Sequence, residues 1–230
     1  MDNYIFAASK SWSQQAFDRY RYRLPGRWVI VTNPDDLTEE LIEALQPKYI
    51  FFPHWSWKVS AKIHEKASCI CFHMTDLPYG RGGSPLQNLI VRGHEETKIS
   101  ALKMVEEMDA GHIYLKESLS LTGSGLEIFE RASDVILGMI LKICTELFVV
   151  TPQEGKIVSF KRRNEEQSEL TSDLSLLQVF DHIRMLDIPG YPHAFIKNNK
   201  LVYEFTQAVS HDNKIYAHVV ISQEENDDNR

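Results

Sequence analysis

Cysteine is scarce in this sequence, with three residues in 230, and three thiols cannot all pair. Cys69 and Cys71 stand in an apolar run, so we expect buried free thiols in a reducing compartment. A Cys-x-Cys spacing with no second Cys or His pair nearby is a poor zinc signal, and we expect no metal site. Any chemistry must come from other side chains.

Excess basic charge and long apolar runs are also missing. The formal net charge of −7 argues against tRNA or DNA as the main partner, because such binding draws on clustered Lys and Arg. Residues 161–163 still allow a local basic patch. No apolar run approaches the roughly 20 residues that span a bilayer. The N-terminus lacks a basic segment followed by a long apolar one. We expect a cytoplasmic protein that binds neither membrane nor nucleic acid.

Short apolar runs alternate with helical patterns over the first two thirds of the chain. Four runs lack the alternation of a half-exposed strand: residues 4–9, 28–32, 48–53 and 68–74. Strands that are apolar on both faces and separated by helices are typical of a parallel sheet covered on both sides. Residues 1–150 are therefore predicted to form an open, doubly wound, mostly parallel α/β domain, closed by a long helix over 123–150.

The rest of the chain is predicted to be a small, β-rich appendage. Residues 151–173 are charged and form the expected linker. A helix and short strands follow in 174–222, with turns at Asn198-Asn199 and Asp212-Asn213. Residues 223–230 are too polar to pack and are expected to be a frayed tail.

His73 stands where the fourth predicted strand ends, in "CFHMTDLPYGRGGSPLQNLI". Ligands of open α/β sheets bind outside the carboxyl ends of the strands. By itself, a histidine there fits a structural role as well as a catalytic one. Asp109, in "EEMDAGHI", fits an ordinary turn. The case for a catalytic role of both residues is strengthened by their position in one longer pattern.

Residues 71–113 resemble the formyltransferase family, which includes methionyl-tRNA formyltransferase and the glycinamide ribonucleotide transformylases. The family pattern is Asn-x-His-x-Ser-x-Leu-Pro, then Arg-Gly, a helix, Gly-Glu-x-x-x-Thr, and Asp-Thr-Gly-x-Ile. Thr75 stands where the family has Ser, and Ala110 where it has Thr. Further on, "FDHIRMLDIPGYPHAFI" is similar to the start of the small C-terminal domain of formyltransferases. The residues in register, without an internal gap, are His73, Leu77, Pro78, Arg81, Gly82, Pro85, Gly93, Thr97, Asp109, Gly111 and Ile113.

The resemblance implies transfer of a formyl group from N10-formyltetrahydrofolate to an amine, without a metal or a covalent enzyme intermediate. His73 would stabilise the charge that develops on the formyl oxygen, and Asp109 would orient the imidazole and help relay the proton of the amine. The family's Asn, two residues before the His, is Cys71 here, and a thiol is a weak donor. Three interpretations stay open. Thr75 or Asn88 substitutes, or His73 and Asp109 suffice, or catalysis is lost.

The family holds the pterin of its cofactor mainly through backbone groups of two loops, which here are "PHWSWK" and "KMVEEMD". The residues that this implies for tetrahydrofolate binding are Ser56, Trp57, Val105 and Glu106. Members with a truncated appendage look like sugar N-formyltransferases, which act on UDP- or dTDP-linked 4-amino-4,6-dideoxy sugars. Aromatic rings can stack on such a ligand, and Arg can pair with its diphosphate. The candidates for this nucleotide-linked amino sugar are His54, Trp55, Tyr79 and Arg81.

Several alternatives accompany this interpretation. Trp55 and Trp57 fit an ordinary apolar core equally well, and Asn88 fits the exposed face of its helix. Within the sugar enzymes the sequence is similar to those of pseudaminic-acid-type pathways. Another small amine such as a hydroxyornithine, or water in a formate-releasing hydrolase, also fits as acceptor. A folate- or nucleotide-sugar-binding protein without turnover is a further alternative. Methionyl-tRNA is disfavoured because its enzymes are longer and more basic. The C-terminal strands are an expected homodimer surface.

Overall fold

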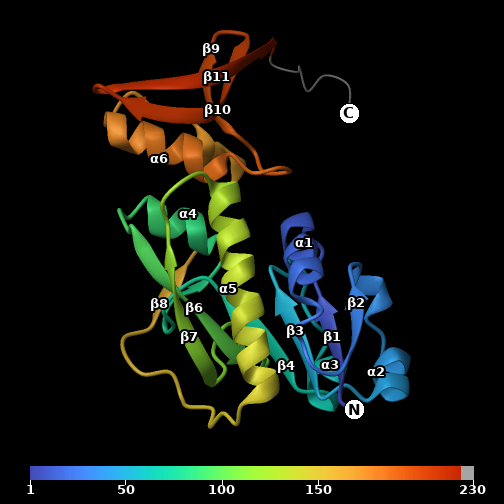
Figure 1. The fold of residues 1–230 in the computed structure, drawn as a ribbon. Helices are drawn as coiled ribbons and strands as arrows, with labels where there is room; N and C mark the ends of the chain where they lie inside the picture. Colours follow the sequence, from blue (N-terminus) through green and yellow to red (C-terminus); the bar gives the residue numbers. More distant parts are fainter. Residues whose placement is uncertain (224–230) are drawn as a thin grey trace. The chain divides into compact units, whose positions relative to one another are not determined.

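The computed structural model describes residues 1–223, and the chain divides into two compact units (Figure 1). The first unit contains Met1–Pro85, Glu96–Ser120 and Phe129–Phe160. The second contains Leu86–Glu95, Leu121–Ile128 and the chain from Lys161 onward. The predicted tail lies outside the described residues apart from Gln223, which ends the last strand.

A six-stranded sheet in the order β2-β1-β3-β4-β6-β7 is the centre of the first unit. Strands β1 to β4 run parallel, whereas β6 pairs antiparallel with both β4 and β7. The predicted open, mostly parallel sheet is therefore confirmed, with two antiparallel strands at one edge. The strands are β1 (Asn3–Ala7), β2 (Arg27–Val31), β3 (Tyr49–Pro53), β4 (Cys69–His73), β6 (Glu96–Lys103) and β7 (Ile113–Ser120).

Helices alternate with the parallel strands, as the apolar spacing predicts. Thr38 caps α2 by accepting from the backbone N–H of Leu41, which satisfies one of the free donors of the first turn. The long helix α5 ends at Thr145 and not at residue 150. The helices of the first 150 residues are α1 (Ser11–Tyr20), a 3-10 turn (Pro34–Asp36), α2 (Glu39–Leu45), α3 (Ala61–Lys66), α4 (Pro85–Ile90) and α5 (Gly125–Thr145).

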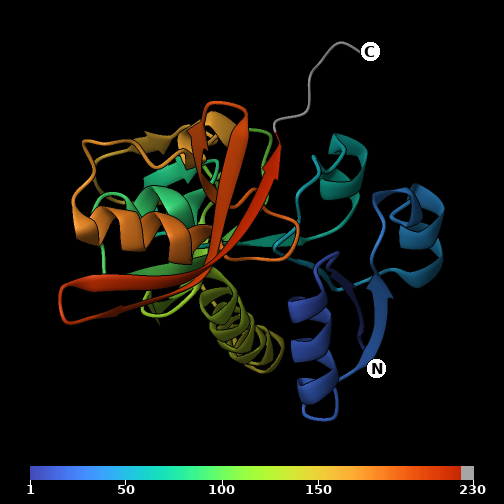
Figure 2. The same ribbon diagram turned by 90° about the horizontal axis from the view of Figure 1, so that it is seen from above.

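Both faces of the parallel strands are covered, because successive side chains of a strand point to opposite faces. On one face, β1, β3 and β4 contribute to a buried cluster with Ile42 of α2 and Ile63 of α3. On the other, the ring of Phe6 contacts Phe17 of α1, with ring centroids 4.6 Å apart. Figure 2 shows the strands of the first unit between these helices. Apolar runs without alternation are the sequence consequence of this two-sided burial.

Residues 151–160, predicted as part of a linker, belong to the first unit. Strand β8 (Val158–Phe160) pairs parallel with β5 (Tyr79–Gly82) in a small two-stranded sheet. Residues 165–168 form a 3-10 helix with an Asn164 capping box. The segment therefore contains regular structure and is not an irregular linker.

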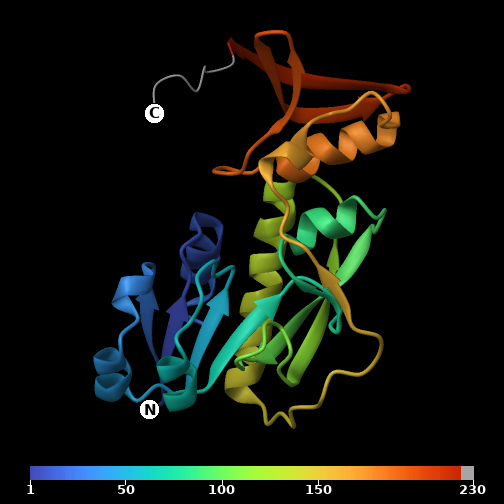
Figure 3. The same ribbon diagram turned by 180° about the vertical axis from the view of Figure 1, so that it is seen from behind.

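The second unit carries the predicted helix and short strands. Helix α6 (Leu176–Leu186) begins with a Ser175 capping box and contacts the antiparallel sheet β11-β10-β9 (Figure 3). The left-handed φ angles of Asn199, Asp212 and Asn213 confirm the two predicted turns. The strands are β9 (Ala194–Asn198), β10 (Leu201–His211) and β11 (Lys214–Gln223). Across residues 1–223, helices long and apolar enough to traverse a bilayer are absent.

Candidate active site

His73 is the last residue of β4, and it is nearly buried, with 8% of its surface exposed. Its Nε2 lies 2.7 Å from the carbonyl oxygen of Gly80. A carbonyl can only accept, so Nε2 carries a proton and donates it in this bond. The tautomer leaves Nδ1 as the ring atom that faces the second predicted catalytic residue.

Asp109 lies in the loop between β6 and β7, in the left-handed region with φ of 54°. Its Oδ2 accepts a hydrogen bond from the backbone N–H of Gly82 at 2.9 Å. The same oxygen is 3.5 Å from Nδ1 of His73. The structure therefore brings together His73, Asp109 and the Arg81-Gly82 loop, which are far apart in sequence.

The loop between β4 and β5 is held by two hydrogen bonds with the side chain of Ser100 of β6. Its hydroxyl donates to the carbonyl of Thr75 at 2.7 Å and accepts from the N–H of Leu77 at 3.3 Å. Thr75 is fully buried, and its Oγ1 donates to Gly80 O at 3.4 Å, so Gly80 receives bonds from both Thr75 and His73. A side chain on Gly80, where φ is +79°, would collide with Phe160. These contacts together restrict the position of the Gly80 carbonyl.

The two residues proposed to support the catalytic pair have different surroundings. Cys71 is partly buried, and burial together with the Asp109 carboxylate raises the pKa of its thiol, so it is neutral at pH 7. Asn88 is buried in the second unit, which excludes the exposed helix face. Its Nδ2 donates to Lys161 O at 2.9 Å, and its Oδ1 accepts from Arg92 at 2.9 Å. The role of Asn88 as a stand-in stays a prediction, and these bonds weigh against it.

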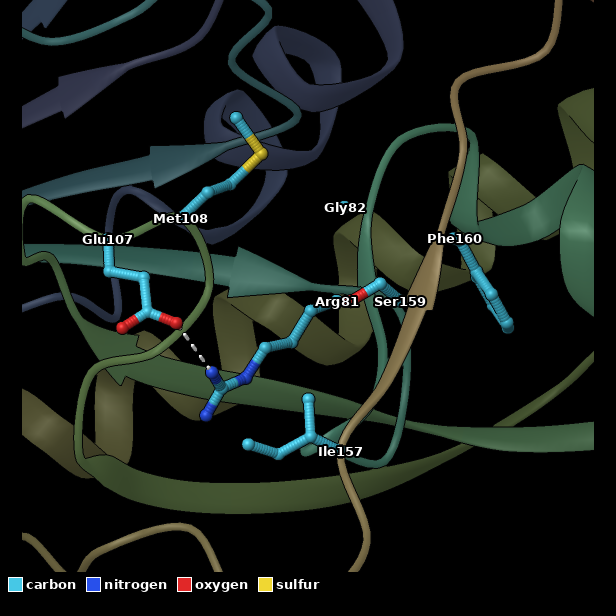
Figure 4. Close-up of a pocket in the computed structure, with 7 residues that line it drawn as sticks. All are labelled: Arg81, Gly82, Glu107, Met108, Ile157, Ser159 and Phe160. Carbon is cyan, nitrogen blue, oxygen red and sulfur yellow. Dashed lines mark hydrogen bonds and ion pairs between the residues drawn. The ribbon is translucent and has the colours of Figure 1, made fainter.

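Arg81 differs from the expectation that it faces a diphosphate. Its Nε and Nη2 donate to Gln153 Oε1 at 3.1 and 2.9 Å, and its Nη1 is 3.0 Å from Glu107 Oε1. Only 13% of its side chain is exposed. Figure 4 shows the guanidinium directed at Glu107 beside a cavity of about 210 Å³. The cavity is lined by Arg81, Gly82, Glu107, Met108, Ile157, Ser159 and Phe160.

The remaining predicted substrate residues lie in the same unit. His54 follows β3, and burial, with a smaller contribution from Lys10, lowers its pKa to about 4, so the ring is neutral at pH 7. The ring of Trp55 stands edge-on to Trp57, with centroids 4.9 Å apart. Tyr79 stands edge-on to Phe160, at 5.4 Å. The neutral His54 ring and the internal bonds of Arg81 weigh against pairing with a diphosphate, and the substrate roles of all four residues stay predictions.

Two loops predicted to hold the folate carry exposed apolar side chains. Trp57 is 44% exposed, Val105 39% and Met108 71%. Ser56 and Glu106 are also exposed. Exposed apolar side chains of this kind can contact a flat heteroaromatic ring. Among residues 1–223, no group of three or more His, Cys, Asp or Glu is placed to hold a metal ion.

Comparison with known proteins identifies the fold and the pattern together. A model of the methionyl-tRNA formyltransferase C-terminal domain matches residues 165–222. The solved methionyl-tRNA formyltransferase from Clostridium thermocellum is 46% identical, with a TM-score of 0.93 over 97% of this chain and 100% of that one. The chain belongs to the formyltransferase family.

Curated members of the formyltransferase family are longer than this chain. The methionyl-tRNA formyltransferase of Mesoplasma florum is 30% identical over 197 residues, which cover 81% of this chain and 63% of that protein. The enzyme of Mycoplasma mycoides subsp. mycoides is 26% identical over 156 residues, 65% of this chain and 49% of that protein. The chain thus spans about half the length of the first curated formyltransferases that it matches.

More distant solved structures share the formyltransferase fold alone. HypX from Aquifex aeolicus in complex with tetrahydrofolic acid is 19% identical, with a TM-score of 0.73 over 89% of this chain and 37% of that one. A sugar N-formyltransferase from Shewanella sp. FDAARGOS_354 is 13% identical, with a TM-score of 0.65 over 98% of each chain.

The sequence pattern of the formyltransferase family missed several residues that shape this site. Gly80 acts through its backbone carbonyl, and its position in "YGRGG", just before the Arg81-Gly82 of the pattern, was the available signal. Ser100 and Gln153 bond to backbone carbonyls, and nothing in the sequence distinguishes them from other polar residues. These contacts depend on tertiary structure and not on spacing.

Proposed function

We propose that the chain transfers a formyl group from N10-formyltetrahydrofolate to a primary amine. The observation that carries this proposal is the pairing of His73 Nδ1 with Asp109 Oδ2 at 3.5 Å, at the family positions of the pattern. The folate, when bound, supplies an activated formyl carbon. The loops around Trp57 and Val105, with their exposed apolar groups, would hold it.

The chain's own residues then have distinct roles. With Nε2 protonated and Nδ1 facing a carboxylate, an imidazolium form of His73 finds an acceptor on both sides. With both N–H groups occupied, the cation would act through its positive charge on the negative charge that develops on the formyl oxygen, and such electrostatic stabilisation is usually the largest single contribution in acyl transfer. Transfer to the amine would break the bond from the formyl carbon to N10, and Asp109 would relay the proton that the amine loses toward N10 of the tetrahydrofolate product.

For the acceptor, we propose the 4-amino group of a nucleotide-linked 4-amino-4,6-dideoxy sugar. The Shewanella sugar N-formyltransferase corresponds to this chain over 98% of both lengths. The net charge of −7 also favours a small substrate over a polyanion. Trp55 and Tyr79 supply rings that can stack on a base or a sugar, while the bonds of Arg81 imply that other groups bind the diphosphate.

A second acceptor, methionyl-tRNA, is favoured by one observation. The Clostridium thermocellum protein of that name is 46% identical over the whole of its own chain. The activity in the name of that protein conflicts with the preference for a sugar over Met-tRNA that chain length and net charge suggest. Formylation of Met-tRNA that declines steeply with added salt would support this acceptor, because binding to tRNA releases cations from its phosphates and added salt opposes that release.

The experiment is a formylation assay with N10-formyltetrahydrofolate and three acceptors: UDP- and dTDP-linked 4-amino sugars, Met-tRNA, and water. We expect sugar formylation that falls at least about 100-fold in His73→Asn and in Asp109→Asn. His211 and Asp212 form an exposed pair 3.1 Å apart, with Asp212 also left-handed, so His211→Asn and Asp212→Asn are matched controls.

The outcomes separate the alternatives. Formylated Met-tRNA with no sugar product would assign the second acceptor. Formate release without an amine would indicate a hydrolase. Folate binding with no product from any acceptor, and no difference between wild type and His73→Asn, would overturn the proposal in favour of a binding protein.

We also propose a homodimer formed through the second unit. Its edge strand β11 exposes three consecutive apolar residues, Val219, Val220 and Ile221, by 45%, 61% and 58%. An exposed apolar edge strand is a template for pairing with another chain, and a twofold interface is self-complementary. Light scattering should give about twice the mass of one chain, and for Val220→Lys it should give the mass of a single chain.

A further inference from the structure

The segment that follows α5 contacts the loop that carries Asp109. Thr151 and Ile113 exchange two backbone hydrogen bonds, Ile113 N to Thr151 O at 2.8 Å and Thr151 N to Ile113 O at 3.0 Å. This isolated bridge fixes the chain beside the start of β7. Gln153, two residues later, is therefore held close to the catalytic loop.

The Gln153 side chain joins that loop to Arg81. Its Nε2 donates to the carbonyl of Asp109 at 2.7 Å and to that of Gly111 at 2.9 Å. Its Oε1 accepts from both Nε and Nη2 of Arg81. Because Arg can only donate and the two carbonyls can only accept, one orientation of the amide satisfies all four contacts. Arg81 thus selects the amide orientation in which Gln153 donates to the carbonyls of the Asp109 loop.

The loop needs such support because its backbone is constrained. Asp109 is left-handed, a conformation that costs a residue with a side chain of order 1–3 kcal/mol and persists when its surroundings enforce it. Gly111 approaches the Lys103 carbonyl so closely that a side chain there would lie 1.7 Å from it. The two carbonyls that Gln153 binds bracket this constrained stretch.

We propose that Gln153 is a positioning residue for catalysis, and that Arg81 holds Gln153 instead of binding the substrate diphosphate. The bonds to the Asp109 and Gly111 carbonyls keep the Asp109 carboxylate on Gly82 N and near His73 Nδ1. The inference rests on the proposed formyl transfer for its kinetic consequence. Its structural consequence is independent of any reaction.

The variant that separates positioning from packing is Gln153→Glu. It has nearly the same shape and keeps an acceptor for Arg81, but its carboxylate cannot donate to the two carbonyls. We expect kcat to fall about 10- to 100-fold, because displacement by about 1 Å can cost 10²-fold. The KM for N10-formyltetrahydrofolate should stay within about twofold. As the pH falls and the new Glu is protonated, it can donate again, so the ratio of variant to wild-type kcat should rise.

Gln178→Glu is the matched control. Gln178 sits in the capping box of α6 and there accepts from Ser175 N, so a carboxylate preserves that bond while adding the same charge. Wild-type kcat is expected. If Gln178→Glu reduced kcat as much as Gln153→Glu, added charge and not lost positioning would explain the effect, and the proposal would be overturned.

Arg81→Met tests the second half of the proposal. Because Arg81 acts through Gln153, the double variant Arg81→Met/Gln153→Glu should be no more than about twofold slower than Gln153→Glu alone. Arg81→Met should leave the KM for the amine unchanged. A tenfold rise in that KM would instead mean that Arg81 binds the acceptor.

The closing experiment reads the carboxylate directly. The amide signal of Gly82 in ¹⁵N-labelled protein reports its bond to Asp109 Oδ2. In Gln153→Glu it should shift toward its position in Asp109→Asn, and in Gln178→Glu it should stay in place. An unmoved signal overturns the positioning role, whatever kcat does. A shifted signal in a chain that formylates nothing supports positioning and rejects the proposed function.

Discussion

Cys71 stands on β4 where the formyltransferase pattern has asparagine, and its chemistry is that of a neutral thiol. Burial raises the pKa of all three thiols, to about 12 for Cys69 and Cys144, and for Cys71 the Asp109 carboxylate raises it further. Nucleophilic or metal-binding cysteines show the opposite shift, toward a thiolate at neutral pH. Cys71 therefore contributes packing beside the catalytic pair and not a reactive sulfur.

Alkylation tests this assignment. Because each pKa unit changes the thiolate fraction tenfold, iodoacetamide at pH 8 should label the three thiols of the native chain at least about 100-fold more slowly than those of the urea-unfolded chain. Intact-mass spectrometry over time gives both rates. A native chain that gains one label at the unfolded rate would show that a thiolate is present.

His54 predicts how stability depends on pH. Its pKa is about 4 in the folded chain, against about 6.5 for an unfolded histidine. As the pH falls below 6.5, the unfolded chain therefore binds a proton that the folded chain does not. The stability contributed by neutral His54 is complete above pH 6.5 and is lost progressively toward pH 4.

The expected loss between pH 7.5 and 5.5 is about 1 kcal/mol of unfolding free energy. It should disappear in His54→Asn, which does not titrate and tolerates the left-handed φ of 50° at this position. Urea unfolding of both chains at the two pH values measures the difference, since other titrating groups are common to both. Equal pH dependence in the two chains would contradict the assignment.

At the residue scale, the site residues that can be predicted from the sequence are those at fixed spacing in the family pattern. His73, Arg81-Gly82 and Asp109 lie in one register, and the structure joins them. Gln153 could not be predicted, because its partners are backbone carbonyls and the Arg81 guanidinium, which any polar residue of suitable length can contact. Arg81 bonds to Gln153 and Glu107, which weighs against its predicted diphosphate role, and that role stays a prediction.

At the scale of elements, the turn between β4 and β5 depends on Ser100. Ser100 is fully buried, and its hydroxyl satisfies both Thr75 O and Leu77 N. Ser100→Ala would remove two hydrogen bonds and leave Thr75 O and Leu77 N with their mutual bond of 3.0 Å, so at about 0.5–1.5 kcal/mol per bond it should cost about 1–3 kcal/mol in unfolding free energy. Turnover should fall too, because the turn carries the Gly80 carbonyl that holds His73.

Ser118→Ala is the control for that variant, since Ser118 is exposed on the neighbouring strand β7 and should change stability by less than about 0.5 kcal/mol. Urea midpoints compare the three chains. The same midpoint for Ser100→Ala and wild type would mean that another group satisfies the turn.

The parallel strands and their helices were predictable because two-sided burial leaves apolar runs. Strand β5 was not, because two of its four residues are glycines with positive φ and its pairing partner lies some 80 residues later in the chain. Strand β6 was also missed. Its four successive buried residues, from Ile99 to Leu102, include Ser100, so the strand shows neither a continuous apolar run nor apolar alternation.

At the scale of the whole molecule, the second unit needs chain from before α6. Arg184 donates to the carbonyls of Leu121 and Gly123, Gln87 donates to Met185 O, and Ile188 packs against Gly125. Cutting at the predicted linker would remove all these partners. The fragment 161–230 alone should show no cooperative melt by circular dichroism, whereas the full chain should.

A cooperative melt of that fragment would show that the earlier segments are dispensable. A second fragment, 1–150, should also fail, because it lacks Gln153 and the strand β8 that pairs with β5. The domain boundary was predicted at a charged stretch because charged residues are exposed. Exposure does not reveal which earlier segments of the chain belong to the second unit.

The interleaving of the two units also bears on biosynthesis. Residues 86–95 and 121–128 leave the ribosome early, but the rest of their unit begins at Lys161. Until that part is made, the buried face of α4, with Leu86, Leu89 and Ile90, lacks the partners of its unit that begin at Lys161. Such transiently exposed apolar surface is what chaperones bind. The nascent chain should therefore engage trigger-factor-like holdases over this window, and release should coincide with synthesis of α6.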